Sequence, residues 1–425
     1  MRDTALQRWT VAAAMGLLGY IVWGIGFYTL PVFYVPLTAE FGWSRTDVTF
    51  AGALASFLYS LSGPGVGAVV DNFGVRKVVL FGVVLFGASL AYFAIGVSTL
   101  SGFFLFACAS GIACMCVSLL PAQVLVSQWF DRNRAGVMGL MLAVMAFGGV
   151  ANAALAGNLI PRVGWHRTAI IFDLMVWTVA LPICLFGIKD RPRKTATAAA
   201  PENPPAQVST LTGLSLAGVW RSPYFYLLCA SVFLNRAVGN ALLQNLVLYM
   251  NDLGHGLQFG AYVMSGLAIA NLVSRLIIGP LSDRFSWRFG VMLSYACIAL
   301  SVLMFLLFSG RPAMFITGLL LGFGYGGSIL MMPVMTGAIF GTRALGKILG
   351  IVLLASGVGS MCGTFLVGRL YDASKSYETA FLFLLVIAVA SVVTIWPVRS
   401  PAMDNRQGGI LLPRKFYKFV WERKE

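Results

Sequence analysis

The chain has 425 residues, of which 59% are hydrophobic and only 11% are charged. A soluble domain usually carries about a quarter charged residues, so this composition excludes a water-soluble globular protein. The formal net charge of +15 does not indicate nucleic-acid binding. The basic residues form short clusters between apolar runs, as in the cytoplasmic loops of membrane proteins.

The residue types also argue against several chemistries. All seven cysteines fall inside apolar runs without a CxxC pair, and the two histidines, His166 and His255, lie beside loops. We therefore expect no disulfide framework, no metal site and no cofactor. No nucleophile–base pair is evident, so an enzyme is the least favoured class.

Taken in chain order, the apolar runs predict twelve transmembrane helices, because a run of about 20 apolar residues crosses a bilayer. The first run is too long for the core of a cleavable signal peptide. The expected spans are 10–35, 46–70, 77–97, 99–128, 135–160, 168–188, 222–250, 258–282, 289–309, 312–341, 347–371 and 377–398. The expected domains are an N-terminal six-helix bundle over 1–188, a flexible cytoplasmic linker over 189–221, a second six-helix bundle over 222–398 and a basic cytoplasmic tail over 399–425.

The distribution of Lys and Arg predicts the orientation of these spans. With the N-terminus in the cytoplasm, 22 basic residues fall on the cytoplasmic side and 6 on the outer side. This asymmetry follows the positive-inside rule, so we expect both termini in the cytoplasm and a location in the inner or plasma membrane. The two basic residues left over, Arg236 and Arg275, fall inside spans.

One short pattern occurs twice, at an offset of 212 residues, which is half the chain length. Its matching positions are Gly67, Asp71 and Arg76 in the first copy and Gly279, Asp283 and Arg288 in the second. Each copy joins the second helix of a half to the third, which indicates a duplicated membrane unit. We interpret the copies as gates, in which the aspartate pairs with a basic residue and holds the halves together in one state. A loop that only retains positive charge in the cytoplasm is the alternative.

This repeated pattern resembles the loop motif of the major facilitator superfamily, although Asn72 stands where that family prefers a basic residue. Four further segments and the eighth span resemble the monocarboxylate transporters and the oxalate/formate antiporters. These stretches are 40–45, 129–134, 220–224, 368–372 and 267–275. The resemblance implies an all-α membrane protein with two pseudo-symmetric six-helix bundles (the major facilitator fold). It also implies alternating access to a site between the halves.

The intramembrane arginines are the strongest candidates for substrate binding. An arginine at the bilayer centre costs about 2.5–3.5 kcal/mol on insertion scales, so each should face a cavity or a partner. Arg236, Asn240 and Gln244 form one polar stripe at helical spacing, and Asn271 and Arg275 form another. A guanidinium binds a carboxylate through two parallel hydrogen bonds, which favours an anion site. An internal ion pair or bonds to backbone carbonyls are the structural alternatives.

The resemblance also bears on how proton binding would be coupled to substrate transport. Monocarboxylate transporters carry an aspartate four residues before the arginine of the eighth helix and a lysine in the first helix. Here these places hold Asn271 and, near the lysine position, Tyr28, so the family's proton coupling cannot be carried over. The oxalate/formate type has a second basic residue in the eleventh helix, and Arg236 is our hypothesis for its replacement. Asp173 is the candidate proton carrier, with a surface pair to Arg167 as the alternative.

Three tyrosines are candidates to line the site, namely Tyr28, Tyr59 and Tyr325, with lipid or interface contact as the alternative. We therefore predict a monomeric secondary transporter for a small organic anion, a mono- or dicarboxylate, working as a proton symporter or an anion exchanger. A drug or metabolite exporter of the same fold is the runner-up. A membrane sensor that binds an anion without moving it is the alternative from another class.

Overall fold

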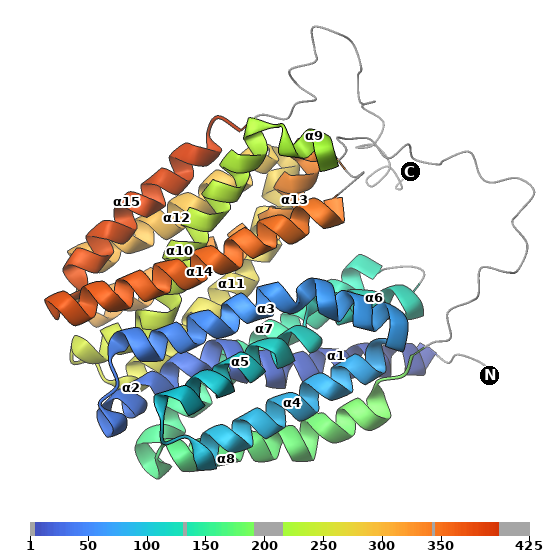
Figure 1. The fold of residues 1–425 in the computed structure, drawn as a ribbon, viewed down its shortest axis with the longest axis horizontal. Coiled ribbons are helices and arrows are strands. Elements are labelled where there is room, and N and C mark those ends of the chain that lie inside the picture. Colours follow the sequence, from blue (N-terminus) through green and yellow to red (C-terminus); the bar gives the residue numbers. More distant parts are fainter. Residues whose placement is uncertain (1–4, 131–133, 191–215, 342–344, 399–425) are drawn as a thin grey trace, which may run out of the picture.

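The computed structural model describes residues 5–130, 134–190, 216–341 and 345–398. Twelve helices within these ranges are long and apolar enough to cross a membrane, as predicted. They form two bundles of six, one from each half of the chain (Figure 1).

In its described residues the N-terminal half contains eight α-helices and three π-helical segments. In chain order they are α1 (Ala5–Trp23), η1 (Gly24–Thr29), α2 (Leu30–Phe41), α3 (Arg45–Phe73), α4 (Val75–Gly96), α5 (Leu100–Cys116), α6 (Leu119–Trp129), α7 (Arg134–Val163), α8 (Trp165–Met175), η2 (Val176–Ala180) and η3 (Ile183–Gly187). The first span is therefore longer than the predicted 10–35, since it runs over α1, η1 and α2. The fourth, predicted as continuous, is divided at Val117 and Ser118 between α5 and α6.

The C-terminal half is more regular. It consists of α9 (Leu216–Trp220), α10 (Pro223–Asp252), α11 (Leu257–Arg284), α12 (Trp287–Leu307), α13 (Arg311–Phe340), α14 (Leu345–Ser374) and α15 (Tyr377–Ile395). Each of its spans is one unbroken helix, and the ends lie within a few residues of the predicted ones.

Small residues let the helices of each half approach closely, as is common in membranes. An added Cβ at Gly363 of α14 would lie 2.3 Å from the carbonyl oxygen of Ala237 on α10. One turn earlier on α14, an added Cβ at Gly359 would lie 2.3 Å from the Phe233 carbonyl oxygen. Gly322 of α13 approaches the backbone of Leu267 on α11 in the same way, at 2.2 Å. The glycine-rich run of α13 is thus a packing surface.

The two halves meet mainly along two helix pairs, α3 with α14 and α7 with α11, and α2 makes a smaller contact with α10. Four glycines of α14 share the face toward α3, because their spacings of 7 and 11 residues are near whole helical turns. A Cβ at Gly368 would meet Thr46 of α3 at 2.6 Å and one at Gly357 would meet Ser60 at 2.9 Å. A Cβ at Gly350 or Gly346 would meet nothing within 4 Å. The contact between halves therefore stops partway along these helices.

The contact between α7 and α11 also stops partway along the two helices. Gly157 of α7 faces Ala261 of α11, where an added Cβ would lie at 2.2 Å, but at Gly139, five turns earlier on the same face, no atom lies within 4 Å. We call the end with Thr46 and Gly157 the closed end, and the other, where residues 190 and 216 lie, the linker end. Figure 1 shows the halves touching at the closed end, near α2, and diverging toward the linker end.

Candidate functional site

A break in the first span positions the first site residue. The segment η1 is π-helical, a geometry that often marks functional sites, and Tyr28 lies within it and is 2% exposed. Gly24 lets this segment pack closely on α7, because an added Cβ would lie 2.6 Å from the backbone carbon of Gly148. Asn152 supports it by donating a hydrogen bond to the Tyr20 carbonyl at 3.1 Å.

Tyr28 meets the second polar stripe across the boundary between the halves. The Asn271 Nδ2 of α11 donates to the Tyr28 hydroxyl at 3.2 Å. Arg275, one turn further along α11, is partly exposed and lies near Tyr28 and Tyr59. The Nε of Arg275 and the Oδ1 of Asn271 are buried without a hydrogen-bond partner. Such unpaired buried polar atoms are costly, so Asn271 and Arg275 stay candidates for contact with a ligand.

Arg236 lies on the other wall of the same cluster. It is 6% exposed, and its Cζ lies 4.8 Å from the centroid of the Tyr325 ring, a cation–π geometry. Tyr325 packs on Gly239 of α10, where an added Cβ would lie 2.9 Å from the ring. In the parts of the chain that the structure describes, no acidic side chain pairs with Arg236 or Arg275. The cluster therefore carries uncompensated positive charge.

An aromatic wall faces this charge from the N-terminal half. Trp23 stacks on Phe27 with ring centroids 5.2 Å apart and lies 6.1 Å from the ring of Tyr59. All three side chains are partly exposed. The indole Nε1 of Trp23 is a buried donor without a partner. The wall thus offers apolar surface and one unpaired donor beside Tyr28.

The rest of the first polar stripe lies nearer the closed end. Asn240 donates to the Thr364 hydroxyl at 3.2 Å, and its Oδ1 has no partner. Gln244 accepts a hydrogen bond of 2.7 Å from the Tyr34 hydroxyl of α2, in the other half. Gln244 therefore joins the halves above the arginine cluster, and its carbonyl oxygen is already engaged.

Asp173 lies apart from the cluster. It is on α8 beside Trp177, whose ring packs against Gly87 of α4 within the N-terminal half. Its Oδ1 has no hydrogen-bond partner. The alternative pairing with Arg167 is not formed. The described residues contain one ion pair, and it joins Arg45 and Asp252.

The two motif copies lie at the linker end and make equivalent contacts. The Arg76 guanidinium of α4 donates to the Leu185 carbonyl at 2.8 Å, and the Arg288 guanidinium of α12 donates to the Val398 carbonyl. Each motif arginine thus ties the start of the third helix of its half to the end of the sixth, which duplication explains.

The other motif residues face away from such contacts. Asp71 and Asp283 are exposed, and neither has an ion pair among the described residues. Gly67 and Gly279 each approach only a leucine of their own half, at 3.7 and 3.8 Å from an added Cβ. Because the halves are apart here, the gating role of the motif stays a prediction.

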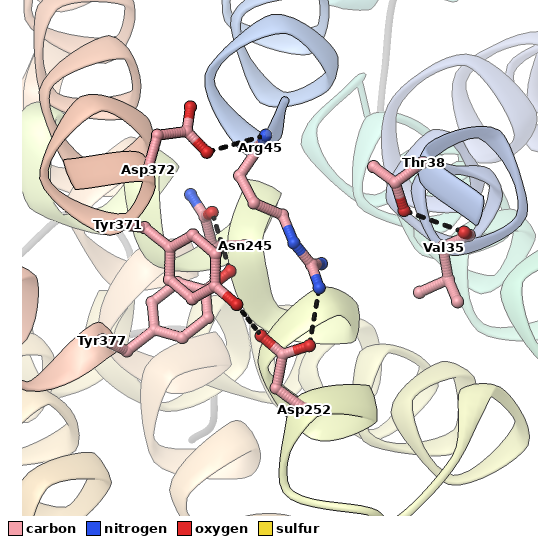
Figure 2. A network of polar contacts seen from close by, with 8 residues as sticks. All are labelled: Val35, Thr38, Arg45, Asn245, Asp252, Tyr371, Asp372 and Tyr377. Atoms are coloured by element: carbon pink, nitrogen blue, oxygen red, sulfur yellow. Dashed lines mark hydrogen bonds and ion pairs between the residues drawn. The ribbon is translucent and has the colours of Figure 1, made fainter. Parts of the chain in front are cut away.

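A polar network that was not predicted from the sequence lies at the closed end, as Figure 2 shows. Arg45 at the start of α3 pairs with Asp252 at the end of α10, with Arg45 Nη2 and Asp252 Oδ1 2.6 Å apart. Asp372 of α14 accepts the backbone N–H of Arg45 at 3.2 Å. The stretches 40–45 and 368–372 carried the resemblance to a transporter group but were given no role. Their opposite charges at span ends were the available signal.

Comparison with known proteins agrees with this architecture. A family model described as the Major Facilitator Superfamily matches residues 16–317 and 247–422. The MFS-type transporter pynF of Aspergillus niger is 25% identical over 93% of this chain and 89% of its own length. Monocarboxylate transporter 13 of Bos taurus is 25% identical over 88% of this chain and 85% of its own.

Solved structures share the fold at low identity. A mutant of the nucleoside transporter NupG superposes with a TM-score of 0.76 at 12% identity, covering 92% of this chain and 99% of its own. A bacterial homologue of the lysosomal transporter Spinster, inward-facing and occupied, gives 0.75 at 15% identity over 95% and 99%. Since the family model spans both halves, the chain belongs to the Major Facilitator Superfamily and is a multi-pass membrane transporter that resembles the monocarboxylate transporters.

Proposed function

We propose that this transporter moves a small organic anion, a mono- or dicarboxylate, by alternating access between the two halves. The observation that carries the proposal is the pair of arginines, Arg236 and Arg275, which lie in one cluster without an acidic partner in the described ranges. A carboxylate would neutralise this charge and accept from the unpaired Nε of Arg275.

The neighbouring groups suit such a cargo. Trp23 offers an unpaired indole donor beside Tyr28, whose hydroxyl contacts Asn271, while Phe27 and Tyr59 offer apolar surface to the apolar part of the cargo. The relatives named monocarboxylate transporter 13 and 12 support the same substrate class. A cation exporter of this fold would need acidic side chains in the cluster, so that alternative is disfavoured.

Exchange of one anion for another is favoured over proton symport. Asn271 occupies the place of a titratable neighbour of Arg275, and Asp173 lies beside Trp177 within one half. Exchange needs no titrating side chain at the site. We further propose that the protein works as a monomer with both termini in the cytoplasm, so that the linker end faces inward.

Uptake into proteoliposomes tests the proposal. The panel contains mono- and dicarboxylates, each with and without an internal anion and a pH gradient. Arg275→Gln should weaken substrate affinity by about tenfold to a hundredfold, since a hydrogen bond to a charged group contributes about 1.5–3 kcal/mol. Arg311→Gln is the control, because Arg311 carries the same charge in the same half but is exposed at the start of α13.

Each other outcome contradicts a part of the proposal. Carboxylate binding without flux would favour a sensor, and flux of cationic compounds would favour an exporter. Equal loss in the Arg275 and Arg311 variants would mean that the cluster does not select the anion.

A further inference from the structure

The first turn of α3 is capped by a carboxylate from the other half of the molecule. Asp372 of α14 accepts hydrogen bonds from the backbone N–H groups of Arg45 at 3.2 Å and Thr46 at 3.0 Å, and from the Thr46 hydroxyl. The first N–H groups of a helix lack intrahelical partners and carry partial positive charge, so a carboxylate placed there stabilises the contact.

This cap is not needed to keep α3 folded. Ser44 already forms a capping box with Asp47, in which the Ser44 side chain accepts from the Asp47 N–H and the Asp47 carboxylate accepts from the Ser44 N–H. When the closed end opens, water can take over the N–H groups of Arg45 and Thr46. Asp372 therefore acts on the position of the two halves relative to each other.

The neighbouring ion pair strengthens the same closure but is the weaker part. Arg45 and Asp252 are 15% and 26% exposed in their side chains, and partly exposed pairs contribute little. The Tyr371 hydroxyl donates to the second oxygen of Asp252 at 2.8 Å, and the Arg45 guanidinium lies 5.3 Å from the Tyr371 ring centroid. Figure 2 shows that Arg45 reaches Asp252 and Asp372 on two different helices.

The second pair of helices at the closed end, α7 with α11, forms a second seam, whose hydrogen bonds join neutral groups. Asn158 of α7 accepts from Gln258 at 2.7 Å and from the Tyr262 hydroxyl at 3.1 Å, both on α11. Ser265 donates to the Val150 carbonyl at 2.8 Å across the same seam. These neutral contacts do not touch Asp372, so they report independently on whether the end opens as a unit.

We propose that Asp372 is a gating residue, which latches the closed end by capping α3 in this conformation and must release it for the site to open on that side. The latch rests on the proposed alternating access but does not depend on which cargo is moved. A failure of the anion-site proposal would therefore leave the proposal for Asp372 intact. Its loss should raise the population in which both seams of the closed end are open.

Hydrogen exchange of the full chain in lipid nanodiscs, resolved by peptide, tests the latch through Asp372→Asn. Exchange follows the open population when closing is fast, and losing a capping group changes an equilibrium by about tenfold. We expect the peptide that contains Gln258 and Tyr262, on the distant seam, to exchange about tenfold faster. A structural cap would change exchange only near Arg45.

Asp190→Asn is the matched control. Asp190 caps α4 in the same way, accepting from the N–H groups of Val75 at 3.0 Å and Arg76 at 3.2 Å, but all three residues are in one half. This variant should leave the distant seam unchanged. If Asp372→Asn does not fold, Thr46→Val removes the hydroxyl contact from the other side and should give a smaller change in the same direction.

Two results would overturn the proposal. One is faster exchange confined to the start of α3 in both the Asp372 and Thr46 variants. The other is an equal increase at the distant seam in the Asp190 control, which would show a general loosening of the protein.

Discussion

Replacing Arg236 by methionine should separate a binding arginine from a structural one. The change keeps the volume and removes the charge. A structural arginine leaves unpaired groups behind when it is removed, so its loss lowers stability by about 3–5 kcal/mol. A binding arginine that awaits its ligand is itself the unpaired charge, so its removal should raise the stability of the empty protein.

The magnitude follows from the surroundings of the guanidinium. Arg236 is 6% exposed and has no ion pair in the described ranges, and burying such a charge costs several kcal/mol. The cation–π contact with the Tyr325 ring at 4.8 Å offsets about 2 kcal/mol of this burial cost. The net gain on removal should be about 1–2 kcal/mol, which corresponds to a rise in Tm of roughly 1–2 °C for a chain of this size.

The assay is thermal unfolding of purified protein without substrate, together with carboxylate uptake in proteoliposomes. Arg45→Met serves as the comparison, because it leaves Asp252 without its partner and should lower Tm slightly. We expect Arg236→Met to melt higher and to transport less. A fall in Tm of several degrees, or a higher Tm with unchanged uptake, would refute the role of Arg236 as a second charge for the substrate.

Two further changes test the packing and the coupling. Gly363→Ala places a Cβ 2.3 Å from the Ala237 carbonyl oxygen and should lower stability by about 1–3 kcal/mol in thermal unfolding. Gly350→Ala, on the same helix with no atom within 4 Å, should be neutral or stabilising by up to about 1 kcal/mol; equal losses would contradict the close approach. Asn271→Asp puts an anion beside Arg275 that competes with the substrate, so uptake should fall at neutral pH and recover only as the pH is lowered toward about 4, where an aspartate carboxylate protonates. A pH profile that matches the unchanged chain would show that this position does not touch the anion site.

The membrane architecture was predictable from the sequence because it depends on local properties. Apolar runs of sufficient length must form helices in a bilayer, where every backbone group needs an internal partner. The capping pattern that starts a helix is also local, as with Ser44 before α3 and Asp47 in its first turn. The chain alone therefore predicted the twelve spans, and the duplicated motif predicted the two-bundle fold.

The candidate site could be predicted only in part. Arg236 and Arg275 stood out because charge inside an apolar span is expensive, whatever the fold. Their neighbours could not be assigned by the same means. Tyr28, which packs against Trp23 and accepts from Asn271, lies in the π-helical segment η1, and such a segment has no clear signature in hydrophobicity.

The sequence by itself determined which segments lie in the membrane, that the two halves are duplicated, and that two arginines are unexplained by duplication. Only the tertiary structure decided that those arginines lack acidic partners in the described ranges, that Asp173 lies away from them, and that Asp372 caps α3. The physical reason is the range of the interactions. Insertion and helix formation depend on neighbours along the chain, whereas the cap joins residues 326 positions apart and exists only where two bundles meet.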